Sequence, residues 1–413
     1  MPPNTGEALP LRPAPRPRIT KVEKEATELL LGSSSTGKDP KHPKINEDTI
    51  YADPERGIGL VADGMGGGVA SDMASETAAK MFIPSALEQH TLDLQSPTGL
   101  PAEDTPEAKQ QRDAAYFQAK LINSVFNSKR DTVKEQPVVE SAVRAMLTYM
   151  NDRVNALRSD PKIIGQAQAK ADELQKIYGG GYTAASLLRG FGSTASLMKF
   201  WRDEHGADRV TVGNVGDSRI YRLRKGTLDR LTRDDSFVQA IIEEGVKDTL
   251  GEPILDDNDV RRRIDLQDLE AKAALRPELE RCLYQIRLEQ EAARARGVQP
   301  LPPTIESIRH VILQYLGMPN QEDFHPFVDT VDAEDGDVFI EVSDNLCDNL
   351  TDDEIETIAR KNADDPVRLV RELQDAAYKR GHGEKTVPPL EPRLRARAKV
   401  DDSSVVAFLF RRG

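Results

Sequence analysis

The chain has 413 residues, of which 38% are hydrophobic and 30% charged, a composition that predicts a soluble protein with one large core or two smaller ones. Its formal net charge of -13 at pH 7 disfavours nonspecific binding of nucleic acid, so no nucleic-acid partner is expected. No stretch approaches the roughly 18 apolar residues of a membrane span, and the N-terminus lacks a signal-peptide core, so no membrane partner is expected. Cys282 and Cys347 stand in dissimilar contexts, which predicts reduced thiols and a cytoplasmic protein.

The chain begins with a proline-rich stretch, which predicts a disordered tail over residues 1–20 and a folded domain over 21–413. Helical spacing of Ala and Met predicts a first helix from Ala70 to about Leu87. A second helix is predicted over Val139–Leu157, with an apolar stripe made of Val143, Met146, Met150, Val154 and Leu157.

Several apolar strands are predicted to end or begin at an aspartate. The runs 57–62, 209–216 and 338–343 lead into Asp63, Asp217 and Asp344, and Asp401 precedes the run 405–410. In antiparallel neighbours the end of one strand lies beside the start of the next, so these carboxylates are expected to converge at one edge. A single strand-end aspartate is more often a turn former or cap, but the recurrence beside Gly, Ser or Asn favours a shared site.

The chemistry of this predicted site follows from its oxygen ligands. No His or Cys stands inside the motifs, and oxygen-only sites suit Mg²⁺, Mn²⁺ or Ca²⁺ rather than Zn²⁺. Crowded carboxylates repel one another unless cations bind between them. Two ions about 3.5–4 Å apart can activate a water for in-line attack on phosphorus, so no protein nucleophile is required.

In their order along the chain, these motifs resemble those of the PPM-type (type 2C) metal-dependent serine/threonine protein phosphatases, and the bacterial members are the nearer match. The resemblance extends over about residues 44–410 and rests on Asn46-Glu47-Asp48, Ala62-Asp63-Gly64-Met65-Gly66-Gly67, Gly192-Ser193-Thr194-Ala195, Asn214-Val215-Gly216-Asp217-Ser218-Arg219, Leu231-Thr232-Arg233-Asp234, Ser343-Asp344 and Asp401-Asp402-Ser403-Ser404. It implies an α+β sandwich of two central antiparallel β-sheets flanked by α-helices, with helical insertions.

The resemblance also implies roles for individual residues. Asp63, Asp344 and Asp401 would be the catalytic carboxylates that hold two Mn²⁺ or Mg²⁺ ions, with the carbonyl of Gly64 as a further ligand. Glu47 and Asp48 would form a second shell, and Asp217 and Asp348 would help to hold a weaker third ion. Asp348 is equally well interpreted as the cap of a helix that begins with Asn349-Leu350-Thr351-Asp352.

The chain departs from the family pattern at several positions. Pro43 replaces the arginine that grips the substrate phosphate, and Lys41 and Lys44 are weak candidates for that contact, because neither offers a bidentate fork. Met65 replaces the histidine found in many eukaryotic members. Asn345 replaces a glycine in a predicted turn, and Asp402 replaces an asparagine, so that Asp402 competes with Asp401 as the candidate ligand.

Three segments are interpreted as insertions: about 91–136, 160–190 and 246–305. The last stands where the family has a flap near the active site, and apolar residues at helical spacing predict an amphipathic helix or helical pair. Covering its own apolar face is the simpler role of this flap. Screening substrates or binding a regulator is the sharper hypothesis. The basic stretch from Lys379 through Arg393, Arg395, Arg397 and Lys399 is interpreted as a solvated loop.

The predicted function is hydrolysis of phosphoserine and phosphothreonine proteins by a metal-activated water, without a covalent intermediate. The alternative is a catalytically weak or inactive phosphatase-like module that binds or regulates, which Pro43 and Asn345 favour and the retained Asp63, Asp344 and Asp401 oppose.

Overall fold

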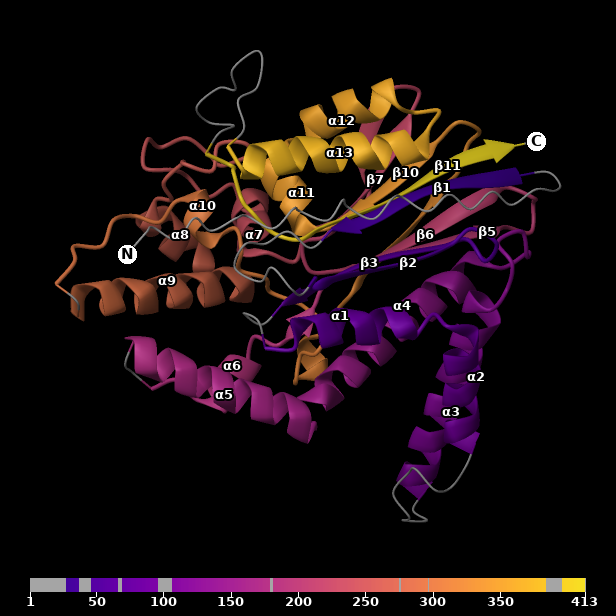
Figure 1. The fold of residues 1–413 in the computed structure, drawn as a ribbon, viewed down its shortest axis with the longest axis horizontal. Coiled ribbons are helices and arrows are strands. Elements are labelled where there is room, and N and C mark those ends of the chain that lie inside the picture. The colour runs from indigo at the N-terminus through magenta and orange to yellow at the C-terminus, as the bar shows by residue number, and fades with distance from the viewer. Residues whose placement is uncertain are drawn as a thin grey trace, which may run out of the picture.

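The protein is described by a computed structural model that covers residues 27–36, 46–65, 69–95, 106–178, 181–274, 276–295, 297–383 and 396–412. Within these residues, two antiparallel sheets pack face to face, and helices cover the outer face of each sheet (Figure 1). The predicted α+β sandwich is therefore confirmed. The tail predicted over residues 1–20 lies outside the described part of the chain.

The first sheet has the strand order β1-β11-β10-β7-β8. Its strands are β1 (Thr27–Thr36), β7 (Arg219–Arg224), β8 (Thr227–Arg230), β10 (Val338–Val342) and β11 (Ser403–Arg412). The helices above it in Figure 1 are α11 (Asp344–Asn349), α12 (Asp352–Lys361) and α13 (Pro366–Gly381). In α13, Leu369, Leu373 and Ala377 recur every four residues and are buried, so one face of this helix packs on the sheet.

The second sheet has the order β2-β3-β5-β6-β9, with β4 paired to the end of β3. Its strands are β2 (Asp48–Asp53), β3 (Ile58–Met65), β4 (Gly192–Ser193), β5 (Ala195–Arg202), β6 (Asp208–Val215) and β9 (Phe327–Asp332). Its outer face is covered by α1 (Ser71–Lys80) and α4 (Gln136–Ala156). The stripe predicted for the second helix is confirmed at Val143, Met146, Met150 and Val154, which are fully buried, whereas Leu157 lies just past α4 and is half-buried.

The prediction of a single first helix is wrong in one respect, because the helix is interrupted between residues 80 and 84. α1 ends at Lys80, and α2 (Pro84–Gln95) begins at a proline. Proline lacks the N–H that an interior helical position needs, but it is well suited to the first turn of a new helix. The segment predicted as one helix is therefore two.

The three segments interpreted as insertions are largely helical where they are described. They carry the end of α2 with α3 (Pro106–Phe126), then α5 (Pro161–Tyr178) with α6 (Ala184–Leu188), and finally α8 (Leu266–Ala273) with α9 (Pro277–Ala295). Short elements complete the chain, namely η2 (Leu157–Ser159), α7 (Phe237–Glu243), α10 (Ile305–Ile308) and η3 (Gln321–Asp323). The α2–α3 hairpin projects away from the sandwich (Figure 1).

The segment interpreted as an enlarged flap has a hydrophobic core of its own. Leu279, Cys282 and Ile286 of α9 are buried in a cluster that includes Phe237 and Ile241 of α7. The predicted helical pair is therefore present, and its buried apolar residues pack against α7, which precedes the segment 246–305. None of the helices in the described residues has the length and apolar character needed to cross a membrane.

An apolar layer fills the space between the sheets, and one carboxyl group interrupts it. Phe200 packs edge-on against Phe339 and Phe408, with ring centroids 5.3 and 5.4 Å away. Glu341 of β10 is fully buried, and a Cβ atom at Gly59 would lie 2.6 Å from its Oε2 atom, so the glycine leaves room for this side chain. Burial raises the pKa of Glu341 well above its usual value, although the Met198 backbone partly favours the charged form.

We expect Glu341→Gln to stabilise the protein increasingly as the pH rises. The folded state holds the proton more tightly than the unfolded chain does, whose pKa is near 4.5. Between that pH and the raised pKa of the folded state, unfolding releases the Glu341 proton. The free energy of unfolding of the wild type therefore falls by up to about 1.4 kcal/mol for each unit by which the pH rises. Urea unfolding of both proteins between about pH 5 and pH 8 would measure this.

The control is Glu88→Gln, at an exposed position of α2. Parallel pH profiles for the wild type and Glu341→Gln would contradict a buried, protonated Glu341.

Candidate metal centre

Asp63 lies near the end of β3, and its backbone is held on both sides by Thr194. The Asp63 N–H donates to Thr194 Oγ1 at 3.1 Å, and the Thr194 N–H donates to the Asp63 carbonyl at 2.8 Å. Asp48, at the start of β2, is the residue directly opposite Asp63 in the strand pair. The sheet therefore sets these two carboxylates side by side.

The same threonine connects Asp63 to the Asp217 turn. Thr194 Oγ1 lies 2.8 Å from Ser218 Oγ, and Gly216 has a φ of +98°. A Cβ atom at Gly216 would lie 2.7 Å from Thr194 Cγ2, so only glycine suits both the backbone conformation and the close approach. The two predicted motifs around residues 194 and 217 therefore act as one support for Asp63.

Gly64 follows Asp63 where β3 meets the N-terminus of α1. Its N–H donates to the Glu47 carbonyl at 3.0 Å, and a Cβ atom at this position would lie 2.2 Å from the Ser71 carbonyl oxygen. The close approach of α1 thus requires a glycine at the position predicted to offer a carbonyl to a metal. Gly66 and Gly67 lie outside the described residues.

The other sheet contributes Asp344 and Asp401. Asp344 is the first residue of α11, directly after β10, and Asp401 lies just before β11. The ends of these strands are fixed to each other, because the Ser343 N–H donates to the Ser404 carbonyl at 3.0 Å and the Ser404 N–H donates to Ser343 Oγ at 2.9 Å.

Asn345 was expected in a turn that a glycine normally fills, and this expectation is wrong. Asn345 lies inside α11, and it is not among the residues with positive φ. Its side-chain Nδ2 donates to the Asp401 carbonyl at 3.2 Å. The asparagine therefore ties the Asp401 loop to α11 rather than straining a turn.

The predicted carboxylates interact strongly with one another. Burial, followed by the charges of Asp48, Asp344 and Asp401, raises the pKa of Asp63 well above its usual value. Burial likewise raises the pKa of Asp48 to about 8 and that of Asp401 to about 6. Crowded, partly desolvated carboxylates hold protons when no cation compensates them. The predicted convergence of strand-end carboxylates is therefore what the structure shows.

Lys399 lies among these carboxylates and was not predicted there. Its ammonium contacts Asp344, and its Nζ atom lies 3.0 Å from Asp348 and 3.2 Å from Asp401. Burial raises the pKa of Asp344, but the charge and hydrogen bond of Lys399, together with the Asp63 hydrogen bond and the Arg309 charge, leave that pKa below its usual value. Arg397 is also buried, with 1% exposure, so the prediction of a solvated loop is wrong for Arg397 and Lys399.

Asp348 and Asp217 lie on the same side of the site as Lys399. Asp348 is inside α11, and Thr351 is the cap of α12, so the capping interpretation of Asp348 is wrong. Burial, together with the charges of Asp344, Asp234 and Asp348, raises the pKa of Asp217 well above its usual value. These two acids therefore belong to the same acidic cluster.

Glu47 is hydrogen-bonded to Asp402, and the Asp402 charge adds to burial in raising the pKa of Asp48. The Glu47 N–H donates to Asp402 Oδ2 at 2.6 Å, and the Glu47 side chain accepts a hydrogen bond from the Ser71 hydroxyl. Asp402 is 3% exposed. Asp401, and not Asp402, is therefore the residue beside Lys399 and Asp344.

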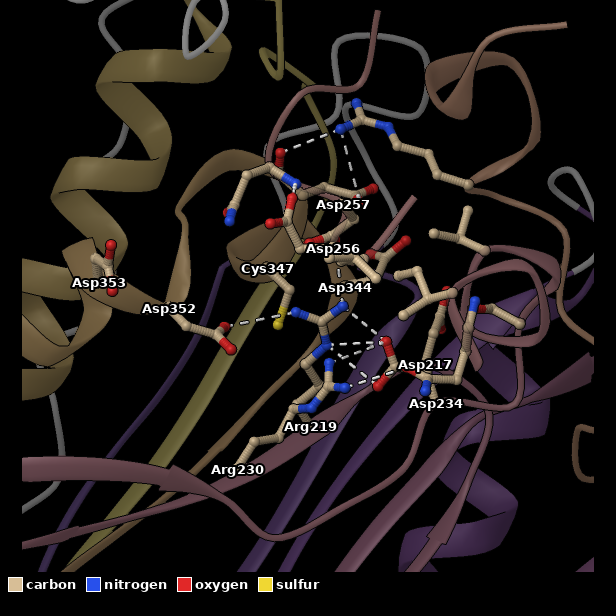
Figure 2. Close-up of a pocket in the computed structure, with 18 residues that line it drawn as sticks. Asp217, Arg219, Arg230, Asp234, Asp256, Asp257, Asp344, Cys347, Asp352 and Asp353 are labelled. Carbon is tan, nitrogen blue, oxygen red and sulfur yellow. Dashed lines mark hydrogen bonds and ion pairs between the residues drawn. The ribbon is translucent and has the colours of Figure 1, made fainter. Parts of the chain in front are cut away.

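A cavity of about 270 Å³ opens beside Asp217, Asp344 and Asp348. Arg219 lies at its centre, with Asp352 on one side and Asp234 on the other (Figure 2). Arg219 donates to Asp234 through Nε to Oδ1 at 3.1 Å and through Nη2 to Oδ2 at 2.7 Å, in the bidentate geometry that makes such pairs strong. Its Nη2 atom is also 3.4 Å from Asp257 Oδ2.

Asp257 attaches the flap to the sandwich at this cavity. Besides Arg219, it faces Arg397, whose Nη2 atom is 3.6 Å away and whose Nη1 donates to the Asp257 carbonyl. Although burial raises the pKa of Asp257, the two arginines lower it below its usual value. Arg309, just after α10, makes a second tie by donating to the carbonyls of Asp348 and Arg397 at 3.1 and 3.3 Å.

The donor set fits hard divalent cations. It consists of carboxylate and carbonyl oxygens, and Asp217 Oδ1 and Asp344 Oδ1 are buried without a hydrogen-bond partner among the described residues. Among the described residues, no group of three or more His, Cys, Asp or Glu side chains is already arranged to hold a metal ion. A cation would have to draw these oxygens together.

The structure leaves two predicted positions untested and adds two that the sequence reasoning missed. Lys41 and Lys44 lie outside the described residues. Lys399 and Arg309 were missed, because each comes near the carboxylates through tertiary packing. The available signal for Lys399 was its place two residues before Asp401, since alternate residues of an extended segment share one side.

No family model matches the chain. A 58-residue segment is 40% identical to the serine/threonine protein phosphatase PstP of Mycobacterium tuberculosis, and it spans 14% of this chain and 10% of that protein. The chain thus covers about a tenth of the curated relative that it matches.

Solved structures similar to this one are PPM-type serine/threonine phosphatases, mostly bacterial, as the motifs predicted. The catalytic domain of PstP with two manganese ions is 19% identical, with a TM-score of 0.45 over 93% of this chain and 99% of that one. MsPP of Mycobacterium smegmatis, in complex with cacodylate, is 18% identical, with a TM-score of 0.43 over 93% and 99%. Because these TM-scores lie below 0.5, the fold assignment rests on the strand order and packing described above.

We expect Thr194→Val to destabilise the protein by about 1–3 kcal/mol, because it leaves the buried Asp63 N–H and the Ser218 hydroxyl without their shared partner. Urea unfolding measures the loss. The matched control is Thr357→Val on α12, where the exposed hydroxyl bonds only within its own helix turn. A loss no larger than that of the control would contradict the supporting role of Thr194.

Proposed function

We propose that this chain is a metal-dependent protein phosphatase that hydrolyses phosphoserine and phosphothreonine esters without a covalent phosphoenzyme. The observation that carries this proposal is the convergence of Asp63 and Asp48 from one sheet with Asp344 and Asp401 from the other. Such a cluster is electrostatically unfavourable by itself and becomes favourable once cations bind. The ordered motifs and the PstP segment support the same activity.

Asp63, the Gly64 carbonyl, Asp344 and Asp401 would hold two Mn²⁺ or Mg²⁺ ions. When bound, such ions would lower the pKa of an attacking water and neutralise charge that develops on the phosphoryl group. The chain itself would keep Asp63 in place through Thr194 and fix Asp344 against Asp401 through Ser343 and Asn345. Glu47 and Asp48 would orient the metal-bound shell, and Lys41 and Lys44 remain candidates for the phosphate contact.

A catalytically weak or inactive binding module is the less well supported alternative. Asn345 is one of the two residues that favoured this alternative, but it lies in a regular helix and holds the Asp401 loop. The other, Pro43, lies outside the described residues. The acids that would hold metal are all retained, so we favour the enzyme.

Release of phosphate from an aryl phosphate, with and without Mn²⁺, tests the proposal. We expect activity only with the metal, and a loss on the order of a hundredfold or more in Asp63→Asn, since even partners of metal ligands contribute 10–100-fold. Asp364→Asn, at an exposed position, is the control. Activity without metal, or undiminished in Asp63→Asn, would defeat the phosphatase proposal.

The substrates proposed are phosphoproteins, in a cytoplasmic setting, and the 21–413 segment would act as one catalytic domain. We further propose that the flap screens these substrates, because Asp257 and Arg309 hold it against the cavity beside Asp344. A phosphopeptide must pass this flap, whereas a small aryl phosphate need not. A regulator that loosens the same ties would change activity toward proteins.

We expect Asp257→Asn to raise hydrolysis of a phosphopeptide by about fivefold relative to an aryl phosphate, because losing roughly 1 kcal/mol of tethering shifts an equilibrium by that factor. Initial rates on both substrates measure the ratio. The control is Asp259→Asn, which alters a nearby exposed pair with Arg261. Equal changes on both substrates would rule out screening by the flap.

A further inference from the structure

Within the described part of the chain, Lys399 carries the one ammonium group that is in contact with three of the acidic side chains of the site. Its Nζ atom contacts Asp344 and lies 3.0 Å from Asp348 and 3.2 Å from Asp401. Its side chain is 23% exposed, and those of Asp344 and Asp348 are 17% exposed. Poorly hydrated charges at these distances attract more strongly than an exposed pair does.

The backbone of Lys399 is fixed by a buried asparagine. Asn349, with 0% exposure, accepts from the Lys399 N–H at 3.1 Å and donates to the Lys399 carbonyl at 2.9 Å. At Gly381, the end of α13, a Cβ atom would lie 2.4 Å from the same carbonyl. The fold thus leaves room for Lys399 and clamps it, which distinguishes it from a mobile surface lysine.

The position of this ammonium is chemically specific. Asp348 and Asp217 are the acids expected to help hold a weaker third ion, and Asp348 is paired with Lys399 instead. Asp344 and Asp401, expected to bind the principal ions, are the other two partners. One tethered positive charge therefore faces carboxylates that divalent cations would also need.

We propose that Lys399 is a built-in cation that takes the place of a third metal ion and competes with divalent ions for Asp344 and Asp401. The proposal rests on the proposed metal centre but concerns only this lysine. Before metal binds, the ammonium offsets repulsion among the acids and stabilises the fold. When metal binds, the ammonium must leave Asp344 and Asp401, so the affinity for metal is lower than the acids alone would give.

Titration of Mn²⁺ into the metal-free protein, followed by the electron paramagnetic resonance of free Mn²⁺, tests this competition. We expect Lys399→Met to bind Mn²⁺ about 10–100-fold more tightly than the wild type, the factor that a charge-assisted hydrogen bond represents. Lys399→Arg, which keeps the cation, should stay close to the wild type. Lys361→Met is the control, because Lys361 pairs with Glu372 at 3.0 Å on the surface.

Thermal unfolding without metal gives a second readout. In the presence of a chelator, Lys399→Met should unfold at a lower temperature than the wild type. Mn²⁺ should raise the unfolding midpoint of Lys399→Met by more than it raises that of the wild type. Recovery of folded Lys399→Met only with Mn²⁺ would support the proposal in the same way. Equal affinity and equal midpoints in the wild type and Lys399→Met would overturn the role of Lys399. That result would leave the phosphatase proposal standing, whereas activity without any Mn²⁺ binding would overturn the phosphatase proposal itself.

Discussion

Repulsion among carboxylates at one end of the sandwich is the constraint on which the rest of the site depends. Asp48 and Asp63 come from one sheet, Asp344 and Asp401 from the other, and Asp217 from the turn that joins them. Their pKa values are mostly raised by burial and by one another. Cations among these acids, whether ions or the Lys399 ammonium, stabilise a fold that brings them together, and without such compensation the acids hold protons.

The motif residues that carry no metal have structural roles that follow from the same constraint. Thr194 and Ser218 connect both sheets to Asp63, and Gly216 leaves the space for this contact. Arg219 binds Asp234 bidentately and reaches Asp257, so the motif that positions Asp217 also anchors the flap. Support for the carboxylates and control of access to them are therefore built from neighbouring residues of one motif.

The flap illustrates how local packing and site geometry combine. The buried apolar residues of its helices pack against α7, whereas Leu250, Leu255 and Tyr284 are exposed. Asp257 also ties it to Arg219, and Arg309, just beyond it, adds a second polar tie beside the acidic cluster. Loosening these polar ties can shift the helices without disturbing the sheets that position the acids.

The sequence by itself determined the strands that lead into Asp63, Asp217 and Asp344 and the strand after Asp401, because apolar runs and turn residues are local signals read along the chain. The sandwich of two sheets was implied by the resemblance of the ordered motifs to PPM-type phosphatases. The sequence also predicted the buried stripe of α4, but not the break before Pro84, whose significance depends on where the first helix ends. Only the tertiary structure decided that Asn345 ties the Asp401 loop to α11 and that Lys399 lies within the cluster. It also placed Asp401 beside Lys399, whereas Asp402 accepts from the Glu47 N–H. These outcomes depend on contacts between residues far apart in sequence, for which the only local signal was the place of Lys399 two residues before Asp401.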